Sequence, residues 1–255
     1  MKNISIFACI LTCYSSFAIK PTKNYIGYPD QYDFKYTESQ IKTPDNICIN
    51  LWDILPNKEN PNNGITIVIC GTDAGNMSYL LAQSLNLADR GFHVISFDYR
   101  GFGKSDNFKI DSTLLFCNEF LIDLETTLNF AKKKYPKNKI GTLGFSMGGY
   151  FSLITTEKLD FIIADSPLIS PKSSIIRDQA LLKGRIINLP PKYLEPNVLL
   201  SVPKLYFIGS QDKFVTLDDV PNSFAIVYKG GHLEAASLLQ DIFFDQIEGF
   251  LTKLK

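Results

Sequence analysis

The chain has 255 residues, a length that suits one large α/β domain better than two small ones. Hydrophobic residues make up 45% and charged residues 20%, which is typical of a globular protein with a substantial core. The 26 basic and 26 acidic side chains cancel, so the chain lacks the basic surface that phosphate backbones require. We therefore expect no nucleic-acid partner.

The first 18 residues predict a secretory signal peptide. Lys2 supplies the positive start, residues 4–11 are almost unbroken apolar sequence, and a cleavage site with small residues ends at Ala18. The apolar run is too short to remain as a membrane span. We expect an exported protein, periplasmic or secreted. Two alternatives stay open, a lipoprotein acylated at Cys13 and a buried first helix of the fold.

Cleavage after Ala18 leaves three cysteines, whose number and spacing suit neither a disulfide scaffold nor a zinc site. Cys70 ends an apolar run and is expected to be buried. A bridge between Cys48 and Cys117 stays open. The chain has only two histidines and no H-E-x-x-H motif, so we expect no catalytic metal and no cofactor.

Short apolar runs alternate with longer helical patterns, which predicts an α/β fold. A pair of edge strands comes first, at Tyr32–Gln40 and Ile47–Leu55, joined by the turn Pro44-Asp45-Asn46. Six apolar runs follow that suit strands buried on both faces of a parallel sheet. They are Ile65–Cys70, His93–Asp98, Ile140–Phe145, Phe161–Ala164, Lys204–Ile208 and Phe224–Tyr228.

Apolar residues at three- and four-residue spacing predict helices between these runs. Helices on both faces of about eight mostly parallel strands would then form one domain, residues 19–255. Residues 170–202 break the rhythm with several prolines and a short helical piece at 175–182, and we interpret them as a short cap or loop insertion. The predicted helices are Met77–Arg90, Ser112–Tyr135, Met147–Lys158 and Leu233–Lys255.

The sequence Gly144-Phe145-Ser146-Met147-Gly148-Gly149 carries the clearest chemical signal. It follows a predicted strand and opens a predicted helix, so Ser146 would stand exposed on a sharp turn, as a nucleophile must. The glycines two before and two after the serine avoid a Cβ collision across that turn. The free amide of Met147 would face developing oxyanion charge.

A serine hydroxyl needs a base, and only two histidines are available. His93 begins a predicted core strand and is expected to be a packed residue. His232 follows the last predicted strand, after Gly230 and Gly231, and is therefore the predicted base. It requires an acid that fixes its tautomer.

Asp212, directly after the run Lys204–Ile208, gives the chain order Ser, Asp, His and is the predicted acid. Asp165 is the second choice, because its strand also ends near the site, and Asp218 and Asp219 are weaker candidates. A second oxyanion donor is expected from the loop 71–76, with the Thr72 amide first and the Asp73 amide second.

The segment Gly103-Lys104-Ser105 copies the end of a phosphate-binding loop, but the first glycine of that motif would fall on Asp98. We expect no phosphate cradle there.

Together these motifs, with Phe97–Ser105 and Gly231-His232, resemble the α/β-hydrolase superfamily over nearly the whole mature chain. The loop after Cys70 resembles its short-capped branch of serine-aminopeptidase-like hydrolases and depalmitoylating thioesterases. The resemblance implies a cofactor-free serine hydrolase, with catalytic roles at Ser146, Asp212 and His232 and oxyanion roles at Met147 and near Thr72. It also implies that Arg100 is structural. The branch usually has His-Gly where this chain has Cys70-Gly71, and the loop is one residue longer.

We therefore expect two-step acyl transfer on a small-molecule ester or thioester, through an acyl-enzyme on Ser146. Two alternatives are open: a peptidase or amidase of the serine-aminopeptidase type, and a non-catalytic exported binding protein on the same fold.

Overall fold

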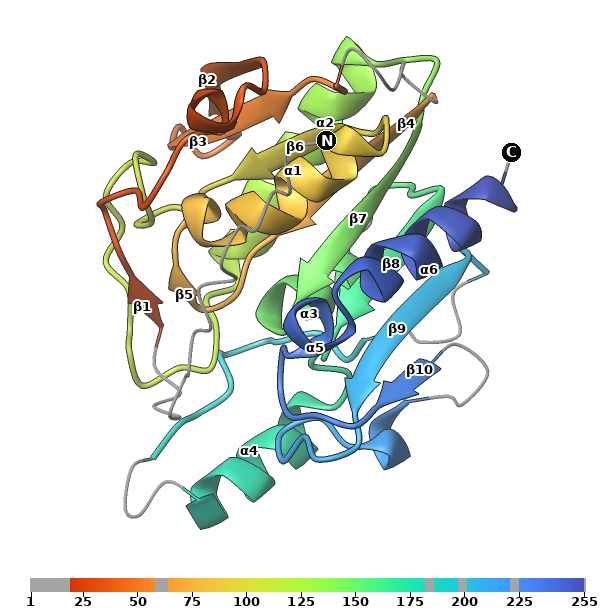
Figure 1. Cartoon of the computed structure of the whole chain (residues 1–255). Coiled ribbons are helices and arrows are strands. Elements are labelled where there is room, and N and C mark those ends of the chain that lie inside the picture. The colour runs from red at the N-terminus through yellow and green to blue at the C-terminus, as the bar shows by residue number, and fades with distance from the viewer. Residues whose placement is uncertain (1–18, 58–63, 182–185, 197–200, 221–224, 255) are drawn as a thin grey trace.

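The computed structural model describes residues 19–57, 64–181, 186–196, 201–220 and 225–254. The predicted signal peptide, with Cys13, lies outside the described residues, as do parts of the predicted cap, 182–185 and 197–200. An eight-stranded sheet in the order β10-β9-β8-β7-β4-β6-β3-β2 crosses the molecule (Figure 1). The prediction of about eight mostly parallel strands is confirmed.

The edge pair β2 and β3 is antiparallel, as predicted, and β3 also runs antiparallel to β6. All other neighbours in the large sheet are parallel. The short strands β1 and β5 pair in a separate two-stranded sheet that the sequence did not predict. The strands are β1 Lys20–Pro21, β2 Tyr36–Lys42, β3 Cys48–Ile54, β4 Ile65–Cys70, β5 Ala74–Gly75, β6 His93–Phe97, β7 Lys139–Phe145, β8 Phe161–Asp165, β9 Lys204–Gly209 and β10 Ala225–Tyr228.

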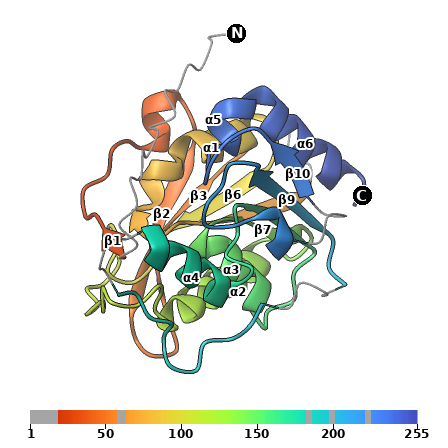
Figure 2. The same cartoon turned by 90° about the horizontal axis from the view of Figure 1, so that it is seen from below.

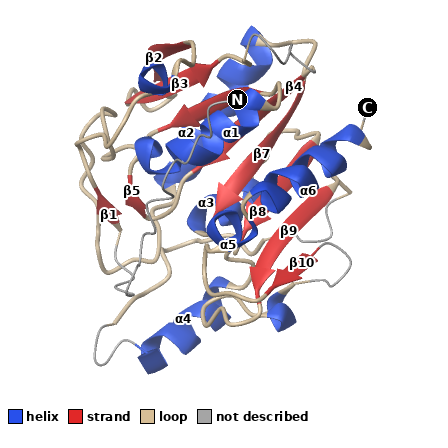
Figure 3. Ribbon diagram, viewed as in Figure 1, coloured by secondary structure: helices blue, strands red, loops and turns tan. Residues whose placement is uncertain are grey.

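Helices cover both faces of the sheet, and each face has its own hydrophobic core (Figures 2 and 3). Helices α2 and α3 pack on one face, and α1 and α6 pack on the other. Helix α4 lies beyond the ends towards which β7 and β9 point (Figure 1). The helices are α1 Leu81–Asp89, α2 Glu119–Lys134, α3 Met147–Ile154, α4 Pro171–Leu181, α5 Ala235–Leu239 and α6 Asp241–Thr252, with 3₁₀ turns at Pro29–Tyr32, Met77–Leu80 and Leu217–Asp219.

All four predicted helices differ from the structure in their bounds. The first begins as the 3₁₀ turn Met77–Leu80, and the third ends at Ile154 rather than Lys158. The other two differ more. Helix α2 begins at Glu119 rather than Ser112, because Leu114 forms a β-bridge with Asn188 and holds the preceding segment out of the helix. The last predicted helix is divided into α5 and α6 at Gln240, whose φ is 49°.

Cys70 is fully buried, as predicted, and Cys48 and Cys117 are free thiols in the structure. Within the described ranges, none of the helices combines the length and the apolar character needed to cross a bilayer.

Candidate active site

Ser146 lies at the turn from β7 into α3, between a buried strand and a buried helix. Its φ of 49° is in the left-handed region, which a residue with a Cβ adopts only when its surroundings hold it there. The Ser146 amide donates to the carbonyl of Asp165 at 3.0 Å, and the Ser146 carbonyl accepts from Tyr150 at 3.1 Å. These bonds fix the backbone while the hydroxyl stays available.

Glycines make this turn sterically feasible. A Cβ on Gly144 would lie 2.5 Å from the Gly149 nitrogen, which confirms the predicted collision across the turn. A Cβ on Gly148 would instead lie 2.1 Å from the carbonyl oxygen of Cys70. The second glycine therefore lets the end of β4 approach the start of α3.

The three residues predicted to cooperate lie in contact. The Ser146 Oγ is 3.0 Å from Nε2 of His232, and Nδ1 of the same ring is 2.8 Å from Oδ2 of Asp212. They come from the turns after β7, β10 and β9, so parallel strands bring the side chains to one edge of the sheet.

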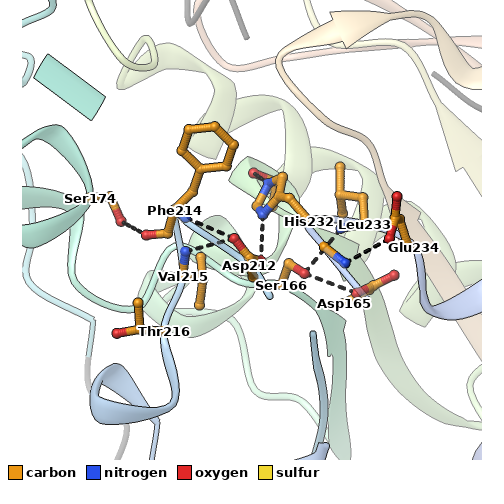
Figure 4. Close-up of polar contacts among 12 residues, drawn as sticks. Asp165, Ser166, Ser174, Asp212, Phe214, Val215, Thr216, His232, Leu233 and Glu234 are labelled. Atoms are coloured by element: carbon orange, nitrogen blue, oxygen red, sulfur yellow. Dashed lines mark hydrogen bonds and ion pairs between the residues drawn. The ribbon is translucent and has the colours of Figure 1, made fainter. Parts of the chain in front are cut away.

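Asp212 is held in place by its own loop (Figure 4). Its Oδ1 accepts the amides of Phe214 at 2.8 Å and Val215 at 3.1 Å, and its side chain is fully buried. Burial alone would raise the pKa of Asp212, but the hydrogen bond and charge of His232 and the two amides outweigh burial and lower it. The carboxylate is therefore ionised where it faces the ring.

The pKa of His232 is shifted in the opposite sense. Burial favours the neutral imidazole, but the hydrogen bond and negative charge of Asp212 outweigh it. The charges of Asp165 and Asp73 add to this effect, and the pKa is raised above its usual 6.5. An imidazole with this environment can accept a proton from a hydroxyl and hold it.

The two predicted oxyanion donors lie on segments that approach each other. The Met147 amide belongs to the first turn of α3, where helix amides have no partner within the helix. The loop after β4 starts close to this turn: a Cβ on Gly148 would lie 2.1 Å from the carbonyl oxygen of Cys70 and 2.7 Å from that of Gly71. Thr72 ties the loop together: its Oγ1 donates to the Ala74 carbonyl at 3.0 Å and accepts the Ala74 amide at 3.1 Å.

The side chain of Asp73 brings a carboxyl group to this site, which sequence reasoning missed. Burial raises the pKa of Asp73 to about 6, and the nearby His232 works against that shift. The Asp73 carbonyl accepts the Lys20 amide at 2.8 Å, so β1 fixes the loop. Asp73 itself, an acidic residue in the loop 71–76, was the available signal, but only the backbone amides of this loop were considered as functional groups.

Asp165, the second choice for the acid, lies at the end of β8 between the strands that carry Ser146 and Asp212. It is not the group that contacts Nδ1 of His232. Its Oδ1 accepts the Ser166 hydroxyl at 3.1 Å, and Ser166 Oγ in turn accepts the Leu233 amide at 3.2 Å (Figure 4). Asp218 and Asp219, the weaker candidates, lie in a 3₁₀ turn, where Asp219 pairs with Arg177 at 2.6 Å.

Helix α4 is tied to the loop of the acid. Ser174 Oγ donates to the carbonyl of Phe214 at 2.9 Å (Figure 4), and Arg177 donates to the same oxygen at 2.6 Å. The Phe214 ring lies edge-on to His232, with centroids 5.3 Å apart. The predicted cap thus contributes a helix that supports one wall of the site.

Other predicted features lie away from the site. His93 begins β6, stacks on Tyr135 with ring centroids 4.3 Å apart, and is a packed residue, as expected. The Gly103-Lys104-Ser105 segment forms no cradle, because Asp98 fills its centre and accepts the amides of Met77 and Lys104. Among the residues that the structure describes, no three His, Cys, Asp or Glu side chains group as metal ligands.

The chain is similar to several known proteins. A family model described as serine aminopeptidase S33 matches residues 71–200, just over half of the chain. An uncharacterized membrane protein of Saccharomyces cerevisiae, YNL320W, is 25% identical over 248 residues, covering 90% of this chain and 84% of its own. The uncharacterized protein YfhR of Escherichia coli K12 is 27% identical over 245 residues, covering 88% and 82%.

Among solved structures, the Pyrococcus furiosus esterase Pf2001 aligns with a TM-score of 0.73 and 20% identity, covering 92% of this chain and 98% of that one. At this identity the likeness shows the fold, and it confirms the α/β-hydrolase architecture that the sequence resemblance implied.

Proposed function

The chain belongs to the serine aminopeptidase S33 family of α/β serine hydrolases, and from that premise we propose that it cleaves a carboxylic ester or thioester through an acyl-enzyme on Ser146. In this proposal His232 is the general base and Asp212 orients it. The amides of Met147 and Thr72 stabilise the oxyanion. The observation that carries the proposal is the unbroken contact from hydroxyl to imidazole to carboxylate, at 3.0 and 2.8 Å.

The reaction runs in two steps. His232 Nε2 takes the proton of Ser146 as Oγ attacks the carbonyl carbon, and Asp212 stabilises the imidazolium that forms. The tetrahedral oxyanion accepts hydrogen bonds from the two amides, and its collapse expels the alcohol or thiol, which takes the proton from His232. Water, deprotonated by the same ring, then attacks the acyl-enzyme and releases the acid.

A fluorophosphonate probe tests this proposal directly, because it modifies only an activated serine. The folded wild-type protein should be labelled at Ser146, and heat-unfolded protein should not. Ser152→Ala is the matched control, since this buried serine of α3 donates to the Gly148 carbonyl rather than to His232; labelling should persist. If folded protein remains unlabelled, the alternative of a non-catalytic binding protein is favoured.

A peptidase or amidase of the serine-aminopeptidase type is the second candidate, and Asp73 is the observation that favours it. In this alternative the Asp73 carboxylate, whose charge acts on the imidazole of His232, binds the ammonium group of an aminoacyl substrate. The kcat/KM of Asp73→Asn should therefore be compared on a neutral p-nitrophenyl ester and on aminoacyl p-nitroanilides. A selective loss of at least about tenfold on the aminoacyl substrates supports the peptidase; an equal effect on both supports the esterase.

We also propose that the protein is exported, because its first 18 residues have the pattern of a signal peptide that ends at Ala18. Expression of the full chain followed by N-terminal sequencing should return a mature protein that begins at Ile19. Retention of Met1, or acylation at Cys13, would replace this proposal with one of the two alternatives.

A further inference from the structure

A second acidic side chain stands beside the base without a role in the mechanism above. Asp165 ends β8, which is hydrogen-bonded to β7 on one side and β9 on the other. Its residue partners across these strands are Phe145, directly before Ser146, and Phe207. The backbone of Asp165 also accepts the amide of Ser146 at 3.0 Å. Its position is therefore fixed by the same strands that fix the nucleophile and the acid.

The carboxyl group of Asp165 is less occupied than that of Asp212. Asp212 uses both oxygens, one for two amides and one for His232. Asp165 is fully buried, and no described group meets full hydrogen-bond geometry with its Oδ2, although the nearby Ala235 amide lowers its pKa. A buried carboxyl that is not fully paired is costly for a fold to keep, which points to a functional reason for it.

Asp165 is also connected to the segment that carries the base. Ser166 donates to Asp165 Oδ1 at 3.1 Å and accepts the amide of Leu233 at 3.2 Å, next to His232 (Figure 4). Ser166 has a φ of 48° and Leu233 a φ of 61°, so both ends of this link are held in the left-handed region. Strain on both sides of the link indicates that it is maintained by its surroundings.

The charges around the two groups agree with this connection. His232 faces Asp212 from the loop after β9, Asp165 from β8 and Asp73 from the loop after β4. Asp165 in turn faces His232, Asp212 and the Tyr228 hydroxyl. Burial raises the pKa of Asp165 to about 7, Asp212 adds to the rise, and His232 opposes it.

We propose that Asp165 is a second acidic positioning residue for His232, which adds negative charge beside the imidazolium and takes over part of that role when Asp212 is removed. The inference rests on the proposed function. Asp165 exchanges no proton with the substrate; the proton still passes from Ser146 Oγ to Nε2. Loss of Asp212 removes the like charge that opposes ionisation of Asp165, so the remaining carboxylate ionises more readily.

A double-mutant cycle on kcat/KM tests this inference. Asp165→Asn is nearly isosteric and should lower kcat/KM about threefold in the wild type, but at least about 30-fold in an Asp212→Ala background. Asp160→Asn is the matched control: it precedes the same strand, at the far end of the sheet, and its amide oxygen can still accept the Ile140 amide. It should have no effect in either background. If Asp165→Asn lowers kcat/KM by the same factor in both backgrounds, the inference is overturned.

A direct titration of the imidazole avoids reliance on the weakened enzymes. The chain has two histidines, so NMR can follow both rings, and His93 serves as an internal control at the other end of the sheet. Asp165→Asn should lower the pKa of His232 by about half a unit or more and leave His93 unchanged. An unchanged His232 titration in a folded variant would refute the electrostatic role.

The two proposals fail differently. A wild-type protein without hydrolytic activity or probe labelling contradicts the proposed function. If the wild type is active, but the effects of Asp165→Asn and Asp212→Ala on kcat/KM are additive and the titration of His232 is unchanged, only the role of Asp165 is contradicted.

Discussion

Two polar clusters in this molecule each gather carboxyl groups around one basic side chain, and they differ in how completely those groups are paired. Around Arg100, Nε and Nη2 contact Asp123 at 2.8 to 2.9 Å, and Nη1 contacts Asp45 at 2.6 Å. Asp123 also accepts the Arg100 amide at 2.8 Å. The guanidinium side chain is 2% exposed and Asp123 is fully buried, while Asp45 pairs with the guanidinium from the surface and is 41% exposed.

The cluster around His232 is arranged in the opposite way. Ser146 has a strained backbone, and its hydroxyl contacts the imidazole of His232. One carboxyl group contacts that imidazole, and the charges of two more act on it. One of them, Asp165, has an oxygen, Oδ2, that makes no geometrically complete hydrogen bond among the described residues, with only the weaker influence of the Ala235 amide on the carboxyl group. Complete pairing of the charged groups thus distinguishes a structural cluster from one whose groups remain available for chemistry. It also agrees with the expectation that Arg100 is structural.

The largest expected effect is on the catalytic rate and concerns the cluster around His232. Ser146→Ala should lower kcat for a short p-nitrophenyl ester by at least about 10⁴-fold, because no other group can form the acyl-enzyme. Stability to urea should stay within about 1 kcal/mol of the wild type, since Ala keeps the Cβ and removes one hydroxyl. Turnover that persists in protein free of contaminating esterases would contradict the assignment of Ser146.

The next largest expected effect is on stability and concerns the cluster around Arg100. Arg100→Met should cost about 3 to 5 kcal/mol in urea unfolding at pH 8, because it leaves the buried Asp123 without its partner. Activity per folded molecule should change less than about twofold. Lys104→Met is the control, because the exposed pair Lys104–Glu38 contributes less than about 1 kcal/mol. A variant with normal stability and severely reduced kcat would reverse the comparison.

On the acid side of the pH profile, kcat/KM is expected to fall about tenfold for each pH unit. His232 must be neutral to accept the proton, and its pKa is raised above 6.5 by Asp212 and the other nearby carboxyl groups. The kcat/KM should therefore fall as pH drops, with a midpoint above 6.5. A midpoint well below 6.5, measured between pH 5 and 9, would mean that burial outweighs the carboxyl groups.

The smallest effect should come from Asp73→Asn. Burial raises the pKa of Asp73 from 3.8 to about 6, so its ionised form opposes folding once pH rises above about 4. The variant should match the wild type near pH 4 and be more stable by about 1 to 2 kcal/mol at pH 7.5, as measured by urea unfolding. Asp218→Asn, at an exposed position, should change stability at neither pH. A stability gain already present at pH 4 would point to another cause.

The sequence predicted those parts of the fold that depend on local patterns. Runs such as Ile65–Cys70 are apolar throughout because both of their faces are buried, and the structure has a strand there with the same bounds. The strand-to-helix turn at Ser146 could be found because a tight turn demands glycines at fixed offsets. Chain order and the scarcity of histidines then pointed to His232 and Asp212.

Features that depend on distant partners could not be predicted. The late start of α2 results from a bridge between Leu114 and Asn188, and no local signal marks it. Nothing in the sequence around Gln240, neither glycine nor proline, indicates the break between α5 and α6. The charge of Asp73 acts on the imidazole of His232 because loops after different strands converge, and the sequence of one loop does not reveal this.

The order of the strands has a consequence for how activity is acquired. The hydroxyl and the imidazole are 86 residues apart, and the parallel strands β7, β8, β9 and β10 must all be paired before the two can meet. Such long-range pairing forms slowly compared with helices. During refolding from urea, recovery of helical circular dichroism should therefore precede the return of turnover, which makes catalysis a reporter of the last stage of assembly.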